Sequence, residues 1–136
     1  MRYMLGVAAL AGLASPIVAQ DRFAERCTGI ETVEIGAGAP RHVRYALTFI
    51  ADLSSGYYRY AQCLPDQTYP IADRAGDPIR LADVRSGSQV RLMTFDRKTS
   101  VLTDHQVFTM LGTVRRDTRA TCRSAIFHAP VPLAKG

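Results

Sequence analysis

The sequence predicts an all-β protein in which about eight short antiparallel strands form a small closed barrel, with a two-sheet sandwich as the alternative. Three observations predict this fold. Beyond residue 20, apolar and polar residues alternate over short runs. Turn-forming glycine, proline, aspartate and serine separate these runs at similar intervals. No helical period extends over a dozen residues in this region. We prefer the barrel because closure limits unpaired strand edges.

The first residues have the composition of a signal peptide. Arg2 is the only charge before Asp21, and an apolar run over residues 4–14 is followed by the helix breaker Pro16. Ala19 provides a small residue for cleavage, although an earlier cut remains open. An uncleaved anchor is the alternative, but the run is rich in alanine and glycine, so we expect no stable membrane anchor. We predict a signal peptide at 1–19, one β domain at 20–128 and an irregular tail at 129–136.

The clearest predicted strand runs from Val43 to Leu53. Its alternate residues are mostly apolar, so one face of the strand is expected to be buried and the other to meet water. Ser54 to Gly56 then predicts a turn, and residues 96–100 predict the loop of a later hairpin. In order, the predicted strands are 28–35, 43–53, 57–63, 68–72, 79–84, 89–95, 101–111 and 119–127.

Three cysteines, Cys27, Cys63 and Cys122, follow the predicted leader. An oxidising compartment favours pairing two of them. We predict a disulfide between Cys27 and Cys122, which would join the first and last strands at the closing seam and leave Cys63 over. On the chain-entropy model such a long loop stabilises the fold by about 4 to 5 kcal/mol. Spacing alone leaves the pairings of Cys63 open.

Positive charge is concentrated in the last third of the chain. The whole sequence carries +5, and residues 97–136 hold 7 basic residues against 2 acidic ones. We predict a possible anion-binding patch of Arg115, Arg116, Arg119 and Arg123, suited to anionic polymers, lipids or glycans. The alternative is nucleotide bias in the genome, since the chain has fifteen arginines, two lysines and no asparagine.

Familiar catalytic and metal-binding patterns are absent from the sequence, so we assign no catalytic residue, metal or cofactor. His42, His105 and His128 lie on three separate segments. Asp104 and His105 are neighbours on a predicted strand, so their side chains should point to opposite faces and form no simple dyad. The aromatic cluster at 57–60 is expected to pack in the sheet rather than to stack on bases or sugars.

Several short segments resemble a group of small exported bacterial proteins with no assigned function. They are Cys27 to Gly29, the hairpin at 92–102 with Phe95, Asp96 and Arg97, and the closing Thr121 to Arg123. The resemblance covers most of the region after the leader. It implies export and a β fold, and it transfers no catalytic residue.

These observations favour a non-enzymatic, periplasmic or extracellular protein that binds an envelope protein or an anionic envelope component. A secreted inhibitor of a cell-wall hydrolase is one form of this hypothesis. The alternative is a hydrolase-like enzyme whose site is assembled from distant residues, with His105 or His128 as the base. Nucleic acid is not an expected partner, because export removes the usual substrate.

Overall fold

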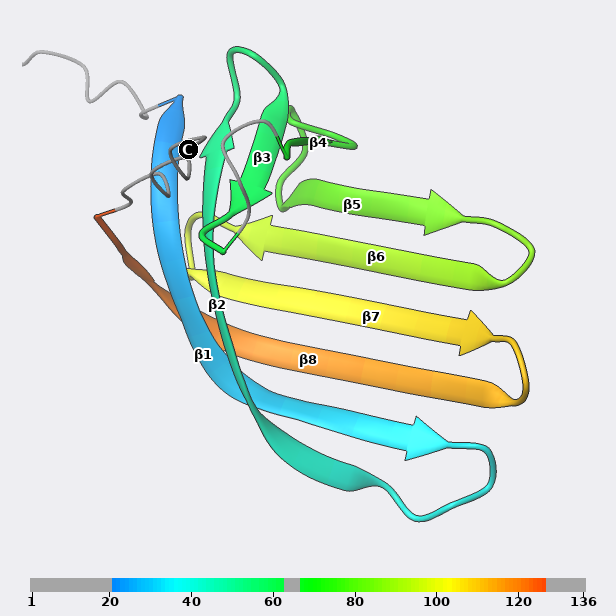
Figure 1. The fold of residues 1–136 in the computed structure, drawn as a ribbon. Helices are drawn as coiled ribbons and strands as arrows, with labels where there is room; N and C mark the ends of the chain where they lie inside the picture. The colour runs from blue at the N-terminus through cyan, green and yellow to red at the C-terminus, as the bar shows by residue number, and fades with distance from the viewer. Residues whose placement is uncertain (1–20, 63–66, 127–136) are drawn as a thin grey trace, which may run out of the picture.

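The computed structural model describes residues 21–62 and 67–126, which form eight antiparallel strands and no helix (Figure 1). One sheet contains all eight strands and curls into a nearly closed barrel, which confirms the predicted fold class. The predicted signal peptide and tail, together with Cys63, lie outside the described residues. Within the described ranges, no helix has the length and hydropathy needed to cross a membrane. The strands are β1 (Arg22–Ile35), β2 (Arg41–Asp52), β3 (Tyr57–Tyr60), β4 (Tyr69–Pro70), β5 (Ile79–Arg85), β6 (Gln89–Asp96), β7 (Val101–Thr109) and β8 (Thr113–Ser124).

The sheet has the strand order β4-β3-β2-β1-β8-β7-β6-β5. The first and last strands therefore pair in the middle of the sheet. The prediction that the closing seam lies between these two strands is wrong, because the seam lies between β4 and β5. The segment after β4 approaches β5 there: the Ala72 N–H donates to the Leu81 carbonyl at 3.2 Å, and Asp73 and Arg80 exchange backbone hydrogen bonds. Figure 1 shows β5 to β8 side by side, with β1 and β2 bending across them.

The pairing of β1 with β8 is unusually close beside the predicted disulfide. Cys27 and Cys122 are directly opposite each other and bonded, which confirms this pairing. Two residues further on, a Cβ atom on Gly29 would clash with the Arg119 carbonyl oxygen. A contact below about 3 Å excludes a side chain, so glycine permits this close approach.

Aromatic residues fill the barrel at the end that contains the disulfide. Phe23, Phe49 and Phe95 contact one another with ring centroids 5.5–6.2 Å apart. Tyr58 and Tyr60 share the inner face, and their rings meet edge to face. The adjacent Tyr57, which points to the opposite face, is 49% exposed. The aromatic cluster therefore packs within the sheet.

Some predicted strand boundaries are wrong. The last strand begins at Thr113, six residues before the predicted start, and the first begins at Arg22 rather than Thr28. In both segments polar side chains occupy inner positions, Arg116 and Thr118 in β8 and Glu25 in β1. Their polarity hides the alternation of apolar and polar residues that marks a strand.

Candidate functional site

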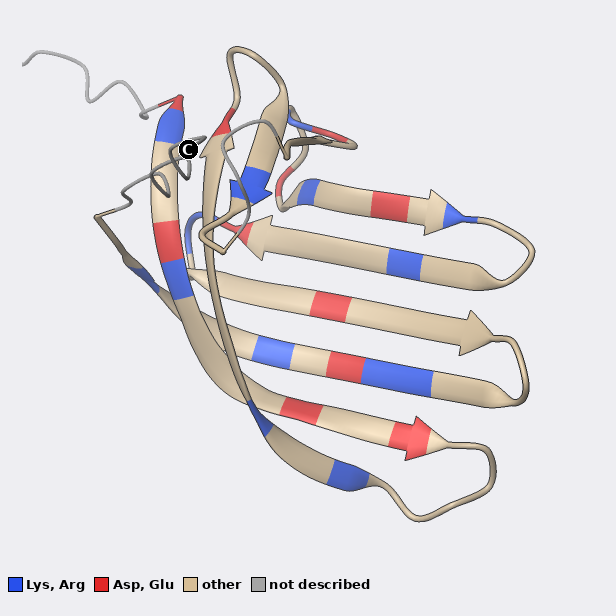
Figure 2. Ribbon diagram, in the orientation of Figure 1, with Lys and Arg blue, Asp and Glu red and all other residues tan. Residues whose placement is uncertain are grey.

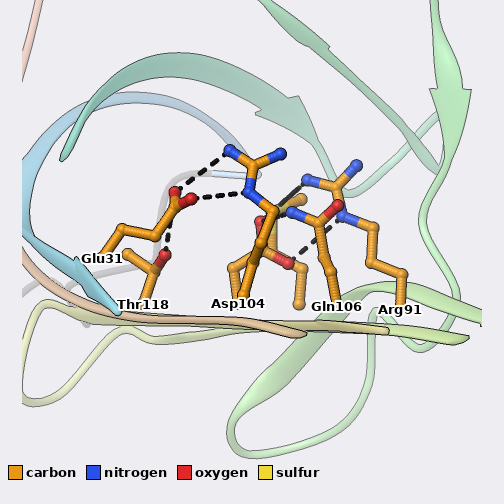
Figure 3. Close-up of polar contacts among 7 residues, drawn as sticks. Glu31, Arg91, Asp104, Gln106 and Thr118 are labelled. Carbon is orange, nitrogen blue, oxygen red and sulfur yellow. Dashed lines mark hydrogen bonds and ion pairs between the residues drawn. The ribbon is translucent and has the colours of Figure 1, made fainter. Parts of the chain in front are cut away.

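Charged residues cross the inner face of the sheet in two adjacent rows. The strand registers place Arg116 of β8, Gln106 of β7 and Arg91 of β6 directly opposite one another, and we call these three the cationic row. Two residues deeper in each strand, the same registers align Glu31, Thr118 and Asp104 as the anionic row. Figure 3 shows the labelled members of both rows rising from the same face of the sheet. The charged rows lie beside the aromatic core in the barrel interior.

Asp104 holds Arg91 in a bidentate ion pair. The Arg91 Nε and Nη2 atoms donate to Asp104 Oδ1 at 3.2 Å and Oδ2 at 2.9 Å. Gln106 Nε2 also donates to Oδ2, at 3.1 Å (Figure 3). Asp104 is 2% exposed. A carboxylate this deeply buried is stable in the charged form only with such partners.

Glu31 holds Arg116 in the same manner. The Arg116 Nε and Nη2 atoms donate to Glu31 Oε1 at 2.5 Å and Oε2 at 3.2 Å, and the Thr118 hydroxyl donates to Oε2 at 3.4 Å (Figure 3). Glu31 is 4% exposed, whereas 42% of the Arg116 side chain is accessible to solvent. Each arginine side chain is thus held in place by a buried carboxylate of the anionic row.

The surroundings keep the charges of these arginines in place. Burial alone would lower the pKa of Arg91, but the hydrogen bond and negative charge of Asp104 raise it above its usual value. The hydrogen bond to Glu31 raises the pKa of Arg116. Burial raises the pKa of Tyr45 and Tyr58, so both phenols remain neutral at physiological pH. The barrel interior therefore contains two permanent cations near neutral phenols.

The predicted arginine patch is divided between the two faces of the sheet. Arg115, Arg119 and Arg123 point outward and are exposed, whereas Arg116 points inward to Glu31. This division follows from strand geometry, since alternate residues of β8 face opposite sides. Arg115 lies directly opposite Glu34 of β1, which offsets its charge. The structure therefore leaves Arg119 and Arg123 as the part of the patch without a facing carboxylate.

Two further arginines lie near this pair on the outer face. Arg26 of β1 is directly opposite Arg123, and Arg44 of β2 is in the same cross-strand line as Arg119, with Ile30 between them. We call Arg26, Arg44, Arg119 and Arg123 the outer arginine patch. All four are exposed, and none forms an ion pair with another residue in the described part of the chain. Figure 2 shows basic residues on the neighbouring strands β1, β2 and β8.

A shallow hollow of about 470 Å³ lies along the outer side of the β1 and β8 pair. Four threonines and Arg119 are among the residues that line it, and Asp117 lies at one end. Asp117 already contacts the His105 ring through Nδ1. The lining residues are Thr28, Gly29, Ile30, Thr32, Asp117, Thr118, Arg119 and Thr121. Its hydroxyl and guanidinium groups are suited to contact an extended anionic ligand.

The histidines do not converge. His42 contacts the Thr32 hydroxyl through Nδ1 at 3.1 Å, His105 pairs with Asp117 on the outer face, and His128 lies outside the described residues. Asp104 and His105 point to opposite faces, as predicted. Among residues 21–62 and 67–126, no group of three or more histidine, cysteine or acidic side chains is placed to hold a metal ion.

Sequence reasoning missed Arg26, Arg44 and the inner rows. One signal for the outer pair was available, because the predicted Cys27 and Cys122 bond implies the register of β1 with β8. Counting outward from the disulfide along two antiparallel strands places Arg26 opposite Arg123. The inner rows had no such signal, because a charged residue in a strand is ordinarily assigned to the outer face.

Comparisons with protein-family models, with curated proteins and with solved structures gave no match. The resemblance to small exported bacterial proteins therefore stays a prediction, and the geometry of the chain itself supports the functional argument.

Proposed function

We propose that this chain is a non-enzymatic, exported binding module whose outer arginine patch holds a polyanionic glycan of the cell envelope. The carrying observation is the direct cross-strand opposition of Arg26 and Arg123, with Arg119 and Arg44 nearby and no ion-pair partner for any of the four in the described ranges. The disulfide between Cys27 and Cys122 is compatible with an oxidising compartment.

Like charges directly opposite each other across an antiparallel pair destabilise a sheet. The fold gains nothing from the pair of Arg26 and Arg123, whereas a bound anion would convert the repulsion into two favourable contacts. Nucleotide bias accounts for the number of arginines, but it does not account for two of them placed directly opposite each other across a strand pair. Arg80 and Arg91 have carboxylate partners, whereas Arg22 and Arg41 form no ion pair in the described part of the chain.

The shape of the surface favours a linear ligand. The patch extends across β2, β1 and β8, and neighbouring strands are about 4.8 Å apart. Arg119 and four threonines are among the residues that line the hollow, so threonine side chains lie beside one of the cations. A chain of sugar residues with repeated sulfate, phosphate or carboxylate groups would contact several of these side chains at once.

Retention on immobilised heparin, a polyanionic glycan, tests this proposal at low salt. The variant Arg119→Glu with Arg123→Glu should elute at much lower salt, with at least tenfold weaker affinity. Arg85→Glu with Lys98→Glu is the matched control, because it changes the net charge equally at side chains that are 80% exposed outside the patch. An equal loss of heparin affinity in both variants would show that the net charge of the chain, and not the outer arginine patch, determines binding. If the chain binds phosphatidylglycerol vesicles and not heparin, the ligand of the patch is an anionic lipid surface and the proposed glycan is wrong.

One contact favours the alternative, an enzyme that uses His105 as a base. Asp117 is placed to orient the His105 ring, as a carboxylate orients a catalytic imidazole. Both side chains are about half exposed on the outer face, however, where water is not excluded. Assays with glycan, ester and phosphate substrates would favour the enzyme if activity is present and is lost in His105→Ala.

A further inference from the structure

Side chains on the inner face change from apolar to cationic to anionic from the apolar end of the sheet toward the core. Ile35, Val114 and Phe108 are directly opposite one another in β1, β8 and β7, and we call them the apolar rim. Ile35 is 62% exposed, and the other two are partly exposed. The cationic row follows two residues deeper, and the anionic row comes after it. A molecule that enters from the rim would therefore meet apolar side chains first and guanidinium groups second.

The two guanidinium groups retain donors for a ligand. Arg91 and Arg116 each use Nε and Nη2 on a buried carboxylate. Their Nη1 atoms make no hydrogen bond within the described part of the chain. Arg116 and Arg91 lie two strands apart, about 9.6 Å between the strand axes. Gln106 lies between them in the row, so a small anion above Gln106 would be within reach of both side chains.

We propose that the inner face binds a small amphipathic carboxylate, with its carboxylate held by Arg116 and Arg91 and its alkyl chain lying against the apolar rim. The order of the two rows favours this occupant, because the guanidinium groups are more accessible than the buried carboxylates that pair with them. The bidentate pairs with Glu31 and Asp104 fix the guanidinium groups in advance, which reduces the entropy lost on binding.

A purely structural role explains this arrangement less well. Buried ion pairs can often be replaced by packed apolar residues without loss of stability, so they are weak evidence of a stabilising function. A structural pair would also be expected to exclude water from both partners. Here 42% of the Arg116 side chain and 23% of the Arg91 side chain are accessible, while both carboxylates are buried. The charged groups that remain accessible are therefore the cations.

Isothermal titration with dodecanoate below its critical micelle concentration tests the inference. We expect saturable one-to-one binding that is at least tenfold tighter than that of dodecyltrimethylammonium or decanol. Equal affinity for these three amphiphiles, or no dodecanoate binding at millimolar concentration, would overturn the inference. The double variant Glu31→Gln with Arg116→Gln preserves hydrogen bonding without the charges, and it should lose at least tenfold in affinity for dodecanoate.

Two controls make the result specific to the inner face. Phe108→Ser at the apolar rim should weaken dodecanoate binding severalfold, and it provides a second test if the double variant fails to fold. Arg119→Glu with Arg123→Glu should lose retention on heparin but bind dodecanoate unchanged, which separates this site from the outer arginine patch. Loss of dodecanoate binding in that outer variant, with unchanged binding in Phe108→Ser, would place the carboxylate outside the barrel.

Discussion

Replacing Arg123 with threonine should stabilise the fold, because it removes the repulsion between Arg123 and Arg26. If the two guanidinium groups are taken to be about 6 Å apart, close to the usual Cβ spacing of directly opposite residues, they repel in water by about 0.7 kcal/mol before screening. Screening leaves about 0.6 kcal/mol at 0.01 M salt, about 0.3 kcal/mol at 0.15 M and about 0.1 kcal/mol at 1 M. The free energy of unfolding of Arg123→Thr should therefore exceed that of the parent most at low salt.

Arg115→Thr is the matched control for this substitution. It lies in the same strand and on the same face, but its cross-strand partner is Glu34, so the change removes an attraction. The two variants share any effect of the strand propensity of threonine. Their unfolding free energies, measured by urea denaturation, should differ by about 1.2 kcal/mol at 0.01 M salt and converge at 1 M. An equal change in both variants, independent of salt, would refute the assigned repulsion.

Three other predictions follow from the described contacts. Cys27→Ala with Cys122→Ala should lower the free energy of unfolding by about 4.7 kcal/mol in urea denaturation, since the bond closes a loop with a sequence separation of 95; a loss below about 1 kcal/mol would contradict the chain-entropy reasoning. Asp104→Ala should lower the free energy of unfolding by about 3 to 5 kcal/mol in the same assay, because it leaves Arg91 without its buried partner. Asp83→Ala should lower it by less than about 1 kcal/mol, because its partner Arg80 is exposed. Equal losses in the two variants would refute an effect of burial. The backbone N–H of Lys98, followed by that of Thr99, lowers the pKa of Asp96 below its usual 3.8, so this aspartate stabilises the fold above that pH and its contribution is lost as pH falls through the lowered pKa. The Tm of Asp96→Asn should therefore drop less than that of the parent chain below pH 3.8. An equal drop in both proteins would oppose the assignment.

The strands with apolar inner faces could be predicted from the sequence. β2 and β6 were predicted to within two residues because Phe49, Phe95 and their neighbours alternate with polar residues. The loop at 96–100 was predicted because Asp96 begins a run of turn residues, and its carboxylate accepts the N–H groups of Lys98 and Thr99. Local chemistry is sufficient where one face of a strand is buried and apolar.

The candidate sites depended on pairing between distant strands, which local patterns do not record. Arg115, Arg116 and Arg119 are close in sequence, yet Arg116 faces Glu31 inside the barrel and its neighbours face outward. The opposition of Arg26 and Arg123 joins residues from the first and last strands. The seam between β4 and β5 was missed for a similar reason, since strand order depends on tertiary pairing.

The salt dependence of heparin binding tests the role of the outer arginine patch most directly. Each cation that neutralises a polyanion charge contributes about 0.7 to 0.9 to the slope of log affinity against log salt, by analogy with nucleic acids. Replacing Arg119 and Arg123 with threonine should therefore reduce the magnitude of this slope by about 1.4 to 1.8. A slope equal to that of the parent chain would contradict this role of the outer arginine patch, because the polyanion would then be bound elsewhere.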